Sequence, residues 1–133
     1  PLVLETPSLL LPMDFALMVQ VLVNLLENAL KYSPPRTPIA VTAQVTGGAL
    51  QISVCDRGDG VPEEDLERIF DKFYRVQRLP RVSGTGLGLA ICRGIVQSHG
   101  GRIWAQNRPG GGLAITLALP CAPAAPSMRS ESA

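Results

Sequence analysis

The chain has 133 residues, enough for one domain and too few for two of ordinary size. Hydrophobic residues make up 46% of it and charged residues 17%, so we expect a globule with an apolar core. The formal net charge of +1 gives no reason to expect nucleic acid as the main partner. No apolar run reaches the roughly 18 to 20 residues of a membrane helix.

The first residues lack the basic start and the cleavage site of a signal peptide. The three cysteines are far apart and form no metal-type spacing or disulfide framework, which favours a reducing, cytoplasmic setting. Because the chain begins with Pro1 and not with Met, we expect it to be a fragment of a longer protein.

The first third of the chain predicts one or two short strands and then a long helix. Residues 2–11 are apolar and are broken by prolines. Asp14 is placed to cap a helix from about Phe15 to Tyr32, because its carboxylate can accept from N–H groups of the first turn. Ser33-Pro34-Pro35 ends this helix. Its apolar face is expected at helical spacing, at Leu22, Leu25, Leu26 and Ala29.

The rest of the chain predicts two hairpins that alternate with helices. The expected elements are strands at 39–45 and 50–55, a short helix at 63–70, a helix at 87–98 and strands at 102–106 and 113–119. Residues 74–85 lack periodicity and are expected to form a mobile loop. Residues 121–133 are expected to be a disordered tail after a domain of residues 1–120. This order favours a mainly antiparallel or mixed sheet with helices on one face, not a doubly wound parallel sheet.

One face of the long helix carries polar side chains at positions i, i+3, i+4 and i+7. These are Asn24, Glu27, Asn28 and Lys31, which share an arc of roughly 100° on the helix surface. Amide and carboxylate oxygens are ligands that suit Mg²⁺, and an ammonium nearby can neutralise a phosphate. The alternative is an ordinary solvated face. Two asparagines in mid-helix weaken that alternative, because Asn is a poor helix former.

An acidic, glycine-containing loop follows the strand at 50–55. Asp56 lies just past the strand end, where its carboxylate can face a cleft and accept from an exocyclic amine such as that of adenine. Gly58 and Gly60 permit positive φ and a close approach of the backbone to a ligand. The alternative is an ordinary turn.

A second glycine-rich segment, Gly84-Thr85-Gly86-Leu87-Gly88, leads into the helix at 87–98. Backbone N–H groups at a helix N-terminus suit phosphates. The segment does not follow a strand and has no Lys-Ser/Thr after it, so it matches neither the dinucleotide fingerprint nor the P-loop. The alternative is a flexible hinge.

Aromatic and basic residues lie between these two loops. Phe70 and Phe73 form an apolar pair that would hold one end of the loop at 74–85, and Lys72 and Arg75 could reach phosphate oxygens. A solvated basic loop is the alternative.

His99 is the only histidine in the chain. It falls in the last turn of a predicted helix, where a histidine interacts favourably with the helix dipole, so we expect a structural role. Without a second histidine, a metal site built on histidines has no basis.

In this order the four motifs resemble the N, G1, F and G2 boxes of sensor histidine kinases, over about residues 10–120. The resemblance implies the Bergerat-type ATP-binding fold shared with gyrase-type and mismatch-repair ATPases. That fold is an α+β two-layer sandwich, with a mixed, mostly antiparallel sheet covered on one face by three helices. A finer match to potassium-responsive Kdp-type sensor kinases rests on residues 28–33, on Gly86 to Arg93 and on Asn107-Arg108-Pro109.

The resemblance also implies roles for individual residues. Asn28, with Asn24 in support, would hold Mg²⁺ at the ATP phosphates, and Glu27 would help to activate the attacking group. Asp56 would bind the adenine amino group. Glu27, Asn28 and Lys31 form the implied catalytic set. The other implied nucleotide contacts are Lys31 and Tyr32 at the phosphates and ribose, Gly58 and Gly60 at the base, Lys72 and Arg75 at the phosphates, and Gly84, Thr85, Gly86, Leu87 and Gly88 in a lid.

The implied activity is transfer of the ATP γ-phosphate to a histidine on a separate dimerisation domain of the same full-length protein. A cognate response regulator would then receive the phosphate, in a potassium or osmotic response. The full-length protein would be a homodimer in the bacterial inner membrane. Because His99 is followed by Gly100-Gly101, it does not match the phosphoacceptor. The alternatives are an ATPase of the gyrase kind, in which Glu27 activates water, and a regulatory module without catalysis that binds nucleotide or a partner.

Overall fold

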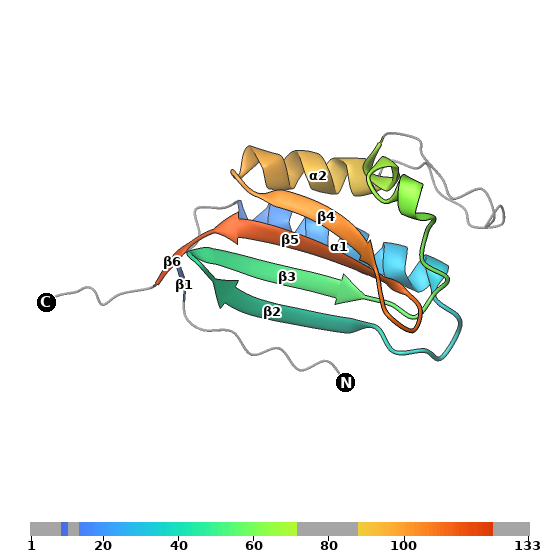
Figure 1. Cartoon of the computed structure of the whole chain (residues 1–133). Helices are drawn as coiled ribbons and strands as arrows, with labels where there is room; N and C mark the ends of the chain where they lie inside the picture. Colours follow the sequence, from blue (N-terminus) through green and yellow to red (C-terminus); the bar gives the residue numbers. More distant parts are fainter. Residues whose placement is uncertain (1–8, 11–13, 72–87, 124–133) are drawn as a thin grey trace, which may run out of the picture.

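The computed structural model describes residues 9–10, 14–71 and 88–123, and we refer only to these (Figure 1). The long helix has the predicted bounds, and each strand of the two hairpins begins and ends within one residue of its predicted position. The elements are β1 (Leu9–Leu10), α1 (Phe15–Tyr32), β2 (Ala40–Thr46), β3 (Ala49–Cys55), the 3₁₀ turns η1 (Glu63–Asp65) and η2 (Arg68–Phe70), α2 (Gly88–Ser98), β4 (Arg102–Asn107), β5 (Leu113–Pro120) and β6 (Ala122–Pro123).

The sheet has four strands in the order β2-β3-β5-β4, and every pairing in the described residues is antiparallel. Helices α1 and α2 pack against each other and cover one face of this sheet (Figure 1). The expected α+β two-layer sandwich is therefore confirmed. Within the described ranges, no helix combines the length and the apolarity needed to cross a membrane.

Two predicted elements differ from the structure. The short helix predicted at 63–70 is a pair of 3₁₀ turns, whose hydrogen bonds join Asp65 N to Pro62 O and Asp71 N to Arg68 O at 2.8 and 2.9 Å. A segment this short cannot sustain an α-helix by itself. Its backbone conformation is instead determined by the side chains of the segment that are buried in the core. The second difference lies in the predicted tail, because β6 pairs with β1. Strand pairing thus extends past residue 120 to Pro123, and residues 124–133 lie outside the described residues.

Hydrogen bonds close the start of α1 and the end of α2, the two places where the sequence predicted caps. The Asp14 carboxylate accepts from Leu17 N at 3.1 Å, which caps α1. At the end of α2, Gly100 has φ +77° and its N–H donates to Gln97 O, while Gly101 N donates to Val96 O, both at 3.0 Å. This is the Schellman pattern, which satisfies carbonyl groups that the helix leaves unpaired.

His99 joins the two helices and therefore has the structural role expected of it. Its Nε2 accepts from the backbone N–H of Asp14 at 2.9 Å, and its Nδ1 lies 2.8 Å from the carbonyl oxygen of Ile95. Since a carbonyl can only accept, the ring is neutral with the proton on Nδ1. The imidazole thus connects the last turn of α2 to the N-cap of α1.

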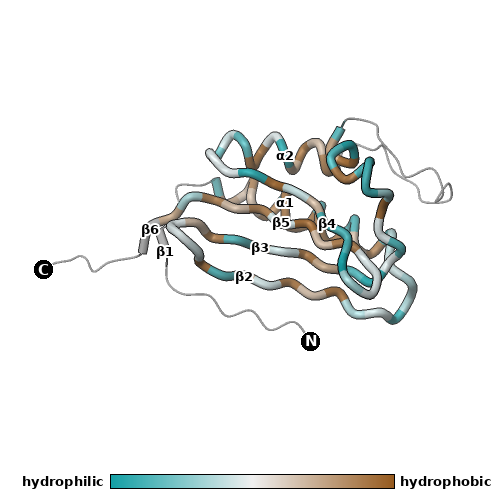
Figure 2. The backbone as a smooth tube through the Cα atoms, viewed as in Figure 1, coloured by the Kyte–Doolittle hydropathy of each residue, from teal (hydrophilic) through white to brown (hydrophobic). Residues whose placement is uncertain are grey.

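The core lies between the helices and the sheet. Helix α1 contributes Met18, Val21, Leu25 and Ala29 to it, whereas Leu22 and Leu26 are only half-buried. The buried face of α1 is therefore turned about the helix axis relative to the predicted apolar face, and it also includes residues nearer the start of the helix. From the sheet, alternate residues of the central strand β5 reach the core, and Figure 2 shows apolar positions along β3 and β5. The core residues of β5 are Leu113, Ile115, Leu117 and Leu119.

Candidate functional site

The polar face of α1 does not take part in the packing of the helix against the core. The core residues of α1 lie on one side of the helix, and Asn24, Glu27, Asn28 and Lys31 lie on another. The two asparagines are half-buried, and Glu27 and Lys31 are exposed. Four polar groups therefore share one face beside the core, and none of them is fully buried.

Asn24 links this face to the start of α2. Its Nδ2 donates to the carbonyl oxygen of Gly88 at 3.4 Å, a long and weak bond, and its Oδ1 accepts from Gln20 Nε2 at 2.8 Å. Gly88, the last glycine of the second predicted loop, therefore lies beside the polar face of α1. Among the described residues, no hydrogen bond uses the side-chain amide of Asn28, so this amide is available to a ligand.

Asp56 is a buried carboxylate with a fixed orientation. The residue is 4% exposed, and its Oδ1 accepts from the backbone N–H groups of Gly58 and Leu113 at 2.9 and 3.0 Å. The Asp56 N–H in turn donates to Leu113 O at 2.9 Å. Within the part of the chain that the structure describes, no hydrogen bond uses Oδ2. One oxygen is thus held by the fold, and the other can accept from a donor such as an exocyclic amine.

The glycines of this loop allow it to lie against the end of α1. A Cβ at Gly58 would overlap the carbonyl oxygen of Tyr32, so only glycine fits there. Gly60 has φ +73°, which side chains rarely adopt. The loop that carries Asp56 therefore contacts the last turn of α1, four residues after Asn28.

The structure also shows site-supporting residues that the sequence did not reveal as such. Asn107 and Arg108, at the end of β4, bond to the loop between Asp56 and Val61. Gly112, in the next turn, has φ +103° and lies where a Cβ would overlap the carbonyl oxygen of Asp56. The run Gly110-Gly111-Gly112 was the one signal that could have indicated this close approach.

Several predicted site residues lie outside the described residues: Lys72, Phe73, Arg75, Gly84, Thr85, Gly86 and Leu87. Just before that range, Phe70 is buried and Arg93 of α2 lies over its ring, 6.0 Å from the centroid. Arg93 also pairs with Asp71 at 3.5 Å. The described part of the aromatic motif thus packs η2 against α2.

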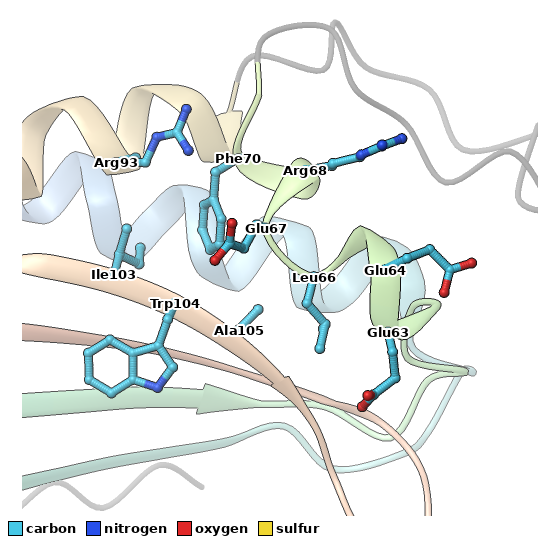
Figure 3. A pocket seen from close by; sticks show the side chains of 10 residues that line it. All are labelled: Glu63, Glu64, Leu66, Glu67, Arg68, Phe70, Arg93, Ile103, Trp104 and Ala105. Atoms are coloured by element: carbon cyan, nitrogen blue, oxygen red, sulfur yellow. The ribbon is translucent and has the colours of Figure 1, made fainter.

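An open cavity of about 690 Å³ lies between η1, η2, α2 and β4 (Figure 3). Its lining within the described residues includes Phe70 of the aromatic motif and none of the implied catalytic or nucleotide-contacting residues. Its lining residues are Glu63, Glu64, Leu66, Glu67, Arg68, Phe70, Arg93, Ile103, Trp104 and Ala105.

The fold matches a solved structure of known class. The mycobacterial sensor histidine kinase MprB superposes with a TM-score of 0.80 at 30% sequence identity, over 86% of this chain and 79% of that chain. Together with the polar face of α1 and the acidic glycine loop, this likeness defines the class: the chain has the architecture of a histidine kinase catalytic domain.

The chain belongs to the family of histidine kinase-, DNA gyrase B-, and HSP90-like ATPases, whose model matches residues 13–123. It is 48% identical over 117 residues to sensor protein KdpD of Escherichia coli strain K12, covering 88% of this chain and 13% of that protein. It is 49% identical over 105 residues to sensor histidine kinase WalK of Bacillus subtilis strain 168, covering 76% and 17%. The chain thus spans less than a fifth of the length of these relatives. It is an ATPase domain of the kind found in two-component sensor kinases.

Proposed function

We propose that this chain binds ATP together with Mg²⁺ and transfers the γ-phosphate to a histidine on a separate dimerisation domain of the same full-length protein. The observation that carries the proposal is the buried Asp56 carboxylate, which keeps one oxygen available beside the amide-bearing face of α1. Membership of the ATPase family supports ATP as the ligand.

At the adenine end, Asp56 Oδ2 accepts from the amino group of the base. The two backbone N–H groups on Oδ1 hold the carboxylate in place, so little ordering is required when the base binds. Gly58 and Gly60 let the backbone approach the base, and Tyr32, which is half-buried at the end of α1, lies beside the ribose.

At the phosphate end, the α1 face fits a hard cation, because amide oxygens are suitable ligands for Mg²⁺. Asn28, with Asn24 beside it, would hold this ion, which neutralises part of the phosphate charge when bound. The exposed ammonium of Lys31 interacts with phosphate oxygens, and Glu27 accepts the proton of the attacking imidazole. Lys72, Arg75 and the segment Gly84-Thr85-Gly86-Leu87-Gly88 complete the proposed set at the phosphates.

The proposed partners follow from this reaction. The histidine of the dimerisation domain receives the phosphate and passes it to an aspartate of a cognate response regulator. The full-length protein is proposed to be an inner-membrane homodimer with this domain in the cytoplasm. We propose a potassium or osmotic response, because the resemblance to Kdp-type sensor kinases is supported by the 48% identity to KdpD.

Isothermal titration of the chain with ATP, with and without Mg²⁺, tests the binding step. We expect Asn28→Ala to remove the Mg²⁺ dependence and Asp56→Ala to abolish binding. Gln44→Ala, on the exposed strand β2, serves as the control. An absence of binding, with both site variants equal to the parent, would support a regulatory module that binds a partner instead.

A phosphotransfer assay tests the reaction itself. The full-length protein should form acid-labile phosphohistidine from γ-labelled ATP, whereas the chain alone should form none. Steady hydrolysis of ATP by the chain alone, lost in Glu27→Gln, would favour the gyrase-type ATPase.

A further inference from the structure

We infer that Asn107 and Arg108 are positioning residues for adenine recognition: they fix the two ends of the loop that carries Asp56. The inference rests on the proposed function and extends it to residues that do not touch the nucleotide. Both residues lie where β4 ends and the turn to β5 begins, opposite the loop in space and far from it in sequence.

Asn107 holds the far end of the loop through both halves of its amide. Its Oδ1 accepts from Val61 N at 2.9 Å, and its Nδ2 donates to Val61 O at 2.7 Å. The side chain therefore pairs with the backbone of one residue in the way that a neighbouring strand would. Gly60, next to it, has no room for a Cβ, because that atom would overlap Asn107 Oδ1.

Arg108 holds the near end of the loop. Its Nη1 donates to the carbonyl oxygen of Asp56 at 2.7 Å, a charge-assisted hydrogen bond. The turn that carries Arg108 is closed by its own N–H, which donates to Gly112 O at 2.8 Å. The same turn presents Leu113 N to Asp56 Oδ1 at 3.0 Å. The β4–β5 turn therefore fixes both the backbone and the carboxylate of Asp56.

These contacts determine where Asp56 Oδ2 lies. A hydrogen bond to the adenine amine depends on an oxygen placed to within a few tenths of an ångström, whereas contacts to ribose and phosphate come from α1 and from other segments. Loosening one end of the loop should therefore weaken recognition of the amine more than it weakens nucleotide binding in general. Loss of preference among bases is the signature that separates positioning from a purely structural role.

The test compares ATP with ITP, which carries a carbonyl oxygen where adenine has its amino group. Dissociation constants are measured for the chain and for Asn107→Ala and Arg108→Ala, together with the thermal midpoint of each. We expect each variant to bind ATP about tenfold more weakly and ITP within about twofold of the parent, so that the preference for ATP falls about tenfold. Arg108→Lys should recover part of the preference, since an ammonium can still donate to the Asp56 carbonyl.

Two variants on β4 that leave the loop contacts intact serve as matched controls. Gln106→Ala removes an exposed amide next to Asn107, and Arg102→Ala removes a guanidinium that lies over Trp104. Both should keep the ATP preference of the parent. An equal loss for ATP and ITP in Asn107→Ala and Arg108→Ala, or a lower thermal midpoint with unchanged preference, would overturn the inference. A parent chain that binds no ATP would instead refute the proposed function.

Discussion

Replacing Asp56 by asparagine should change which base the chain prefers without disturbing its fold. Asparagine has nearly the same shape, and its Oδ1 can keep both hydrogen bonds from Gly58 N and Leu113 N. The two N–H donors also fix the orientation of the new amide, because an NH₂ group turned toward them would face two donors. The NH₂ group must then occupy the position of Oδ2, where it meets the amino group of adenine.

The size of the effect follows from the loss of one hydrogen bond to a charged acceptor. Such bonds contribute about 1.5 to 3 kcal/mol, so ATP should bind about 10- to 150-fold more weakly. ITP presents a carbonyl oxygen at the same position and can accept from the new NH₂ group. The order of affinity should therefore reverse, with ITP binding more tightly than ATP to Asp56→Asn.

Titration calorimetry with both nucleotides measures this reversal, and thermal unfolding confirms that the fold is retained. Asp59→Asn is the matched control, since Asp59 lies in the same loop but is exposed. Unchanged affinity for ATP in Asp56→Asn would refute the reasoning. So would equal weakening of both nucleotides, because recognition would then not depend on the donor or acceptor character at this atom.

Four further predictions concern stability and reactivity. Burial raises the pKa of the Cys92 thiol to about 11, so at pH 8 an alkylating reagent should modify the other two, partly exposed cysteines and leave Cys92 until the chain unfolds. Because an unfolded thiol would titrate near 9.0, the free energy of unfolding should also fall as the pH rises from there toward 11, a decline that Cys92→Ala should remove. Leu25→Ala empties a fully buried position and should cost about 2 to 5 kcal/mol in urea denaturation; a cost under about 1 kcal/mol would contradict the core assignment. Gly58→Ala should destabilise the chain, because the new Cβ would overlap the Tyr32 carbonyl oxygen. Gly94→Ala, which adds a Cβ in open space on α2, should stabilise the chain by up to about 1 kcal/mol. Equal effects of the two substitutions would contradict the close approach of Gly58 to Tyr32.

The long helix could be predicted to the residue because its signals are local. Asp14 and Ser33 lie directly at its two ends, and each forms a hydrogen bond within one or two turns. The segment at 63–70 carries no comparable signal. Ile69 and Phe70 are neighbours in sequence and both are buried, so contacts with the core decide its shape, and these are not visible in a short stretch of sequence.

The candidate site likewise has one part that local sequence signals predict and another that depends on contacts between distant residues. The spacing of Asn24 and Asn28 predicted a shared polar face, because helical periodicity is a local property. The pairing of Asn107 with Val61 joins residues 46 apart in the chain, and that of Arg108 with Asp56 joins residues 52 apart. Only the register of β4 on β5 and of β5 on β3 brings these groups together, so no motif in one segment could indicate them.

The glycines of the first loop also have a structural role that the motif alone does not indicate. The sequence predicts that Gly58 lets the backbone approach a ligand closely. In the structure its lack of a side chain lets the loop contact the Tyr32 carbonyl on one side, while Gly112 contacts the Asp56 carbonyl on the other. The loop is therefore held between the end of α1 and the β4–β5 turn. Because Asp56 is already ordered there, binding should require little further loss of entropy, and glycine contributes a fixed site and not a flexible one.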